Sequence, residues 1–224
     1  MKFSSAIIGL VAVSQTASAH YIFNQLLVNG QANTAAVRQP QNNSPVKPVT
    51  STDMRCNVSP GHATDTVSVN AGDSIGFGIS VGKVYHQGPA AIYLGKAPGA
   101  ASAWDGSGTN WFKIAEWGVA SYNPFTFKSL NQNQFVTTIP KNTPSGEYLI
   151  RMEQIGLHVL PPEAFMSCAQ IKINNGGSGN PPKVAIPGYI GAGDASVNVN
   201  IYPPYPSSYT CPGPASITFK AGFI

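Results

Sequence analysis

One histidine of this chain stands where it could offer a metal ion two nitrogens at once. His20 directly follows Ala17-Ser18-Ala19, small residues of the kind after which a signal peptidase cleaves. Cleavage there would make His20 the first residue, and its α-amino nitrogen and ring Nδ1 could then close on one metal as a chelate. An α-amino group has a pKa of about 7.7–8, so a metal can displace its proton near neutral pH.

A second imidazole opposite this chelate would complete three nitrogen ligands, and nitrogen ligands in tetragonal geometry favour copper. The chain has three further histidines, His62, His86 and His158. His86 comes just before Gly88-Pro89, a pair that predicts a tight loop able to hold a side chain outward. His62 follows Pro60-Gly61 and reads equally well as a solvated loop residue. The residues alone therefore favour His86 but leave the other two open.

The segment before His20 has the three parts of a secretory signal peptide. Lys2 gives a positive start, and residues 6–13 form an apolar run too short for a permanent membrane anchor. With the small residues at 17–19 as the cleavage site, we expect residues 1–19 to be removed and the protein to be secreted. No later segment reaches the about 20 consecutive apolar residues of a membrane span, so no membrane partner is expected.

Composition and patterning predict one all-β domain over residues 20–224. The chain has 23 glycines and 19 prolines, and charged residues make up only 10% of it. Long helical stripes are absent after residue 19, the stretch 174–182 reads as a surface loop, and no appended carbohydrate-binding module follows. Six segments read as short strands, most with the alternation of half-buried strands: 66–69, 74–79, 147–152, 169–173, 184–187 and 196–201.

The charge of the chain argues against one class of partner and suits another. The net charge of +4 is small, and the lysines and arginines are scattered, so nucleic acid is not an expected partner. A sparsely charged surface rich in Asn, Gln, Ser and Tyr suits a neutral polar partner such as a polysaccharide.

The cysteines and two sequons are compatible with export. Three cysteines allow one disulfide and leave one thiol over; Cys56 could pair with Cys168 or with Cys211, and spacing does not choose between them. Asn42 and Asn57 begin glycosylation sequons, but a proline follows each sequon, so neither adds weight.

Several short motifs follow His20 in a fixed order: residues 51–57, 86–89, 93–94, 111–114, 146–151, 167–170, 186–188 and 212–214. Each is weak alone, but in this order they make the chain resemble the fungal lytic polysaccharide monooxygenases of auxiliary activity family 9 over nearly all of residues 20–224. The resemblance implies a disulfide between Cys56 and Cys168. Cys211 is then the odd thiol, which we interpret as a small buried apolar residue.

The resemblance also implies a fold and a site. The fold is an immunoglobulin- or fibronectin-III-like β-sandwich with long surface loops, and one flat face carries a single copper ion. His20 and His86 are the implied copper ligands, and His158 matches an outer-sphere histidine that helps to position and protonate the oxygen species. Tyr209 matches a tyrosine that stacks on sugar rings.

Two positions depart from the family's usual pattern. Where the family carries Gln-Phe-Tyr shortly before Cys-Ala-Gln, this chain reads Glu163-Ala164-Phe165. Phe165 thus replaces the axial tyrosine and can only keep the axial position dry. Glu163 replaces the glutamine and can carry charge or a proton beside bound oxygen. The nitrogen ligands are unaffected, so we expect copper binding to persist, and the Phe–Glu pair resembles the bacterial branch of these monooxygenases.

These expectations describe a secreted, monomeric, copper-dependent monooxygenase that takes electrons from an external donor. It would use O2 or H2O2 to abstract hydrogen at C1 or C4 of cellulose or an associated glucan and so cleave the glycosidic bond. The missing axial tyrosine motivates an alternative, a non-catalytic secreted protein on the same fold that binds copper or cell-wall polysaccharide. A glycoside hydrolase would need two carboxylates across a cleft, and the nine acidic residues include no recognisable pair.

Overall fold

The structure, a computed structural model, describes residues 20–217; the predicted signal peptide, residues 1–19, lies outside the described residues. Among residues 20–217 no helix is long and apolar enough to cross a membrane. The strands and two short 3-10 helices are β1 Gln25–Val28, β2 Gln31–Asn33, β3 Val37–Arg38, η1 Thr52–Met54, β4 Val67–Asn70, β5 Ser74–Gly78, β6 Ala90–Lys96, η2 Ala101–Ala103, β7 Thr109–Trp117, β8 Val119–Tyr122, β9 Phe125–Phe127, β10 Gln134–Thr138, β11 Gly146–Gly156, β12 Glu163–Asn174 and β13 Val184–Ala185.

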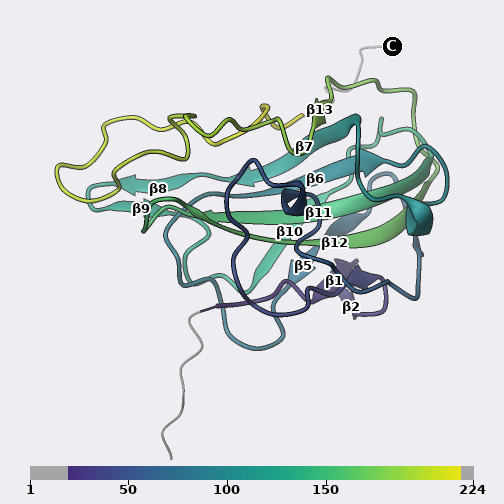
Figure 1. Cartoon of the computed structure of the whole chain (residues 1–224). Helices are drawn as coiled ribbons and strands as arrows, with labels where there is room; N and C mark the ends of the chain where they lie inside the picture. The colour runs from purple at the N-terminus through teal and green to yellow at the C-terminus, as the bar shows by residue number, and fades with distance from the viewer. Residues whose placement is uncertain (1–19, 218–224) are drawn as a thin grey trace, which may run out of the picture.

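Two sheets face each other (Figure 1), which confirms the predicted all-β sandwich. The smaller sheet has the order β10-β5-β1-β2, and the larger has the order β13-β7-β6-β11-β12-β3, with β4 pairing in parallel with β12. Strands β8 and β9 form a separate hairpin. Four of the expected strands, at 66–69, 74–79, 147–152 and 169–173, fall on β4, β5, β11 and β12, and the segment 184–187 begins with β13.

The larger sheet is buried on both faces, so its central strands are not the half-buried strands that alternation suggested. On β11, Ile150 and Met152 belong to the core between the two sheets, whereas Leu149 belongs to a second core beneath a layer of loops. That second core explains why the middle of β11 is buried on both faces, with apolar side chains and with Arg151 paired to Glu153. The interpretation of 147–152 and 169–173 as half-buried was therefore wrong for their central residues, and it holds only near Glu147 and Lys172.

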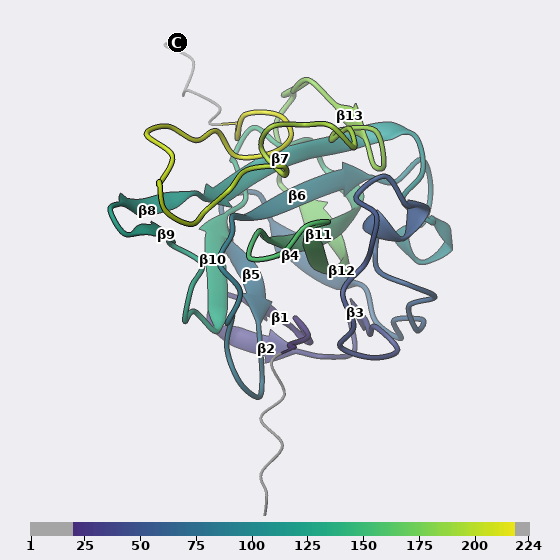
Figure 2. The same cartoon turned by 60° about the vertical axis from the view of Figure 1, so that its left-hand side comes forward.

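The C-terminal part of the chain belongs to this loop layer. Figures 1 and 2 show it running beside β7 and β8, in yellow-green and yellow. The strand expected at 196–201 does not form, because Asp194 turns the backbone there. Its side-chain oxygen accepts from the N–H of Ser196, and its carbonyl accepts from the N–H groups of Val197 and Asn198. Val197 is still buried in the second core. The apolar alternation at 196–201 therefore correctly predicted buried side chains but wrongly predicted a strand.

A disulfide joins Cys56, next to η1, to Cys168 in the middle of β12. This is the pairing that the resemblance implies. Cys211 is a free cysteine and is partly buried. Burial, with a smaller effect of Glu116, raises the pKa of its thiol to about 11. Little reactive thiolate therefore exists at neutral pH, which agrees with the interpretation of Cys211 as a small packing residue.

Removing the disulfide should destabilise the fold strongly, because it closes a sequence separation of 112 residues. By loop-closure entropy, Cys56→Ala combined with Cys168→Ala is expected to lower the free energy of unfolding by about 4–5 kcal/mol. Guanidinium chloride unfolding measures the loss. Cys211→Ala serves as the control, with an expected change below about 1 kcal/mol. Equal stability of the double variant and the parent would contradict a structural role for this bridge.

Candidate metal centre

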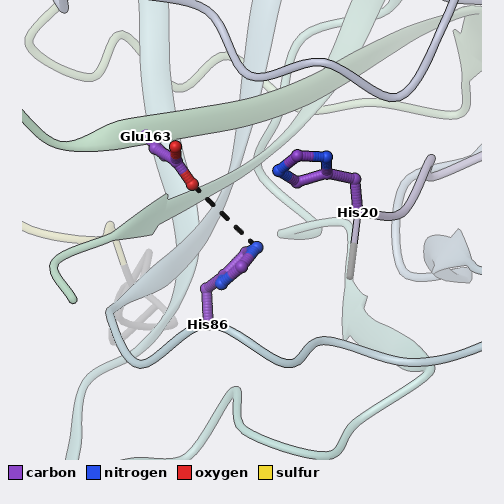
Figure 3. Close-up of side chains that lie close together, drawn as sticks. All are labelled: His20, His86 and Glu163. Atoms are coloured by element: carbon purple, nitrogen blue, oxygen red, sulfur yellow. Dashed lines mark ion pairs between the residues drawn. The ribbon is translucent and has the colours of Figure 1, made fainter. Parts of the chain in front are cut away.

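Three segments that are far apart in the sequence meet at one end of the sandwich, and each brings a metal-ligating side chain. His20 begins the described chain, His86 lies in the loop before β6, and Glu163 is the first residue of β12. One nitrogen of each histidine and one oxygen of Glu163 lie within 4.8 Å of one another. Figure 3 shows the three side chains converging on a common point. Their donor atoms, two imidazole nitrogens and a carboxylate oxygen, suit a transition metal.

The pairing of β11 with β12 places one wall of this centre. Gly156, the last residue of β11, is paired with Glu163, and Gln154 is paired with Phe165. The short connection between the two strands carries His158, whose ring stacks on that of His86 with centroids 4.1 Å apart and planes 5° from parallel. A Cβ on Gly156 would lie 3.1 Å from both His158 Nδ1 and His86 Cβ, so a glycine there leaves room for the stacked rings.

The loop that carries His86 is fastened to the end of β11 by backbone contacts. The N–H of Ile155 donates to the carbonyl of Pro89 at 3.0 Å, and the N–H of Leu157 donates to that of Gln87 at 2.7 Å. Between these two contacts, the backbone of Gly88 lies so close to the end of β11 that a Cβ on Gly88 would lie 1.8 Å from the carbonyl oxygen of Ile155. The tight loop predicted from Gly88-Pro89 is present, and a close backbone approach explains its glycine.

Gln154 connects the two histidine-bearing segments. This side chain is fully buried, and its amide nitrogen donates to the carbonyl of His86 at 3.2 Å. Its amide oxygen accepts a short hydrogen bond from the hydroxyl of Tyr21, the neighbour of His20. Burial, with a smaller effect of Glu163, raises the pKa of Tyr21 well above its ordinary value, so the phenol keeps its proton and donates. One amide thus fixes the position of both segments.

Phe165 forms an apolar wall against both histidines. It is 2% exposed, and its ring centroid lies 5.6 Å from that of His20 and 5.4 Å from that of His86. Tyr21 packs on it at 4.7 Å. The side chain offers no ligand atom, so it can exclude water on this side without competing for a metal. Its place is compatible with the expected axial position, which stays a prediction.

Glu163 is surrounded by positive and titratable groups. Its Oε1 lies 3.0 Å from Lys47 Nζ, and its Oε2 lies 3.5 Å from His158 Nε2 and 4.0 Å from His86 Nε2. Burial alone would raise the pKa of the carboxyl, but the hydrogen bond and charge of Lys47, helped by the two histidines, outweigh burial and lower it. Glu163 is therefore ionised near neutral pH.

His158 is held neutral by its surroundings. Burial lowers the pKa of its imidazole, and Lys47 and His20 lower it further, against the opposing effect of Glu163. A neutral imidazole has one donor nitrogen and one acceptor nitrogen. His158 Nδ1 is buried and has no hydrogen-bond partner among the described residues, while Nε2 faces Glu163. The outer-sphere position expected for His158 is consistent with this geometry.

The remaining histidine and the expected sugar-stacking tyrosine lie outside this group. His62 is exposed and is not one of the clustered ligands. Tyr209 is mostly covered: its ring packs edge-on against Phe125 and Phe127, and its hydroxyl donates to the carbonyl of Ser196. Only the part of the ring that these neighbours leave exposed could stack on a sugar, and that stacking stays a prediction.

Three residues at or near the site are not among those singled out from the sequence. Lys47 reaches Glu163 from a distant segment, a contact that no local pattern announces. Gln154 did carry a signal, since it is an amide on the face of β11 that is otherwise formed by Tyr148, Ile150 and Met152. Tyr202 is 56% exposed and donates to the carbonyl of His158 at 3.0 Å, which places an exposed phenol next to the centre.

Comparison with known proteins identifies similar chains. The model of Auxiliary Activity family 9 (formerly GH61) matches residues 20–209. The AA9 family lytic polysaccharide monooxygenase H of Malbranchea cinnamomea is 44% identical over 96% of this chain and 98% of that protein. The AA9 family lytic polysaccharide monooxygenase E of Podospora anserina is 44% identical over 92% and 71%. The crystal structure of a cellulose-active polysaccharide monooxygenase from M. thermophila superimposes with a TM-score of 0.80 at 28% identity, over 89% and 99%.

Gly88→Ala should weaken copper binding at this centre. The new Cβ would collide with the carbonyl oxygen of Ile155, so the loop must shift and carry His86 away from His20. We expect the dissociation constant for Cu(II) to rise at least about tenfold, which corresponds to about 1.4 kcal/mol. A competition titration of the protein that begins at His20 measures it.

Gly99→Ala is the matched control, because a Cβ at Gly99 meets nothing within 4 Å. Equal copper affinity for both variants would show that the Gly88 loop does not hold the metal ligand in place.

Proposed function

The chain belongs to Auxiliary Activity family 9 and is therefore a lytic polysaccharide monooxygenase, and we propose that it oxidises cellulose or an associated glucan at C1 or C4 with O2 or H2O2. As a family member it is a copper-dependent enzyme that acts on a polysaccharide and uses an external reductant. The observation that carries the proposal is the convergence of His20, His86 and Glu163, whose donor atoms lie within 4.8 Å of one another.

The donor set fits one copper ion per chain. Imidazole nitrogens bind transition metals at about 2.0–2.1 Å, so two of them on one ion lie at most about 4 Å apart. Nitrogens that already lie within 4.8 Å need only a small adjustment. His20 and His86 would hold the ion, together with the α-amino nitrogen of His20 once residues 1–19 are removed. Bound copper supplies the one-electron chemistry that activates the oxygen co-substrate.

The surrounding side chains divide the other tasks between them. Phe165 and Tyr21 close the apolar side of the centre and exclude water there. His158 Nε2 and Glu163 Oε2, 3.5 Å apart, can hold a proton between them beside the metal position. Glu163 is ionised and His158 is neutral. The pair would therefore accept a proton before it donates one.

The exposed surface next to His158 suits a sugar chain. Tyr202 is 56% exposed, and Leu160 is 61% exposed beside it. Both residues, together with His158, help to line a hollow of about 310 Å³. Aromatic and apolar groups stack on the CH faces of sugars. We propose Tyr202 as a sugar contact near the centre, with Tyr209 as a second one.

The proposal includes the processing of the chain. Residues 1–19 would direct export, which agrees with the extracellular occurrence of this family, and their removal would free the amine of His20. Residues 20–224 would then act as one monomeric catalytic domain.

Product analysis tests the function directly. The secreted protein, loaded with copper and incubated with a reductant and amorphous cellulose, is expected to release oxidised oligosaccharides that mass spectrometry detects. His86→Ala should lower their yield at least about 100-fold, because a ligand is lost, whereas His62→Ala should leave it unchanged, because His62 is exposed outside the centre.

The opposite result has a specific meaning. If the copper-loaded protein releases no oxidised product from glucan, xylan or chitin, the chain is a copper-binding or polysaccharide-binding protein on this fold. Phe165, which cannot donate a hydrogen bond at the axial position, is the observation that would account for that outcome.

A further inference from the structure

Lys47 faces Glu163 because of a short backbone bridge. Val46 and Ala164 form an antiparallel pair, in which the N–H of Val46 donates to the carbonyl of Ala164 at 2.8 Å and the reverse bond measures 3.2 Å. In such a pair the residue after Val46 lies opposite the residue before Ala164. Lys47 and Glu163 are therefore cross-strand neighbours, and the backbone rather than a chance reach of the lysine brings them together.

The ion pair divides the two oxygens of the carboxylate. Lys47 Nζ lies 3.0 Å from Oε1, whereas Oε2 faces His158 Nε2 at 3.5 Å and His86 Nε2 at 4.0 Å. The Lys47 side chain is 37% exposed and that of Glu163 is 15% exposed, so the lysine approaches from the solvent side. One oxygen is thus bound by an ammonium group, and the other points at the histidines.

Glu163 lies close enough to the metal position to become a ligand itself. Its oxygen is within 4.8 Å of the ligand nitrogens of His20 and His86, and carboxylates bind divalent metals readily. A carboxylate on the metal would occupy a position that a co-substrate needs. Moving Glu163 inward would break its 3.0 Å contact with Lys47, so the ion pair opposes that movement.

We propose that Lys47 is a positioning residue that holds the Glu163 carboxylate beside the copper site and outside its coordination sphere. The inference rests on the proposed function, since it requires copper at His20 and His86. It extends that function to a residue outside the ligand set, which would act on the metal position through Glu163.

Electron paramagnetic resonance of the Cu(II) protein tests this role without measuring activity. Lys47→Met keeps the aliphatic stem and removes the charge, so we expect Glu163 to enter the coordination sphere and the copper hyperfine pattern to change. Cu(II) should bind about fivefold tighter, the fold-change of about 1 kcal/mol that an ion pair at a protein surface typically contributes. Lys47→Arg should keep the parent spectrum, because it restores the cation.

Further variants connect any change to the ion pair. In a Glu163→Gln background, Lys47→Met is expected to leave the spectrum and the affinity unchanged, because no carboxylate remains to move. Lys183→Met is the matched control, since Lys183 is bonded to Asn180 at a separate surface site. Thermal unfolding of the metal-free proteins checks that each variant is folded, and Lys47→Gln repeats the test with a polar side chain.

Two results would overturn the inference while leaving the copper site intact. The first is a Lys47→Met protein whose spectrum and affinity match the parent. The second is an effect of Lys47→Met that persists without the Glu163 carboxylate. If the parent protein takes up no copper at His20 and His86, the proposed function fails, and this inference fails with it.

Discussion

The register between β11 and β12 is the constraint on which the metal centre depends. Eleven residue pairs, from Gly146 opposite Ile173 to Gly156 opposite Glu163, align the two longest strands. Side chains alternate between faces along a strand, so a slip of one residue would turn Glu163 and Phe165 to the opposite face. Both faces of the larger sheet are buried, each against a different core. Such a slip is therefore penalised, because it would place the side chains of one core in the other. Fold stability thereby fixes the orientation of the site residues.

Gln154 links the fixed register of β11 to the positions of the two histidines. It lies at the end of the β11 face that packs toward the smaller sheet, opposite Phe165. Both ends of its buried amide are occupied, one by Tyr21 and the other by the carbonyl of His86. A buried polar group left without partners costs about 1–3 kcal/mol, so the segments on either side are held where the amide needs them. The start of the described chain is thus tied to the same strand as the His86 loop.

Much of the fold and most of the centre could be predicted from the sequence, for different reasons. Alternation located β4 and β5, because turn residues delimit them, but it could not show that β11 is covered on both faces, since the second core comes from distant loops. The motif order suggested His20, His86 and Glu163 as neighbours, and the structure brings them together. Lys47 could not be predicted, because its contact depends on an isolated bridge between segments more than a hundred residues apart.

A crystal structure of the secreted protein with copper bound tests this arrangement most directly. It should show the chain starting at His20, and copper held by the amine and ring nitrogen of His20 and by one ring nitrogen of His86. Phe165 should lie against the metal, and Glu163 should remain paired with Lys47. Copper bound elsewhere, a chain that starts at another residue, or a Glu163 oxygen on the metal in the unmodified protein would contradict the account.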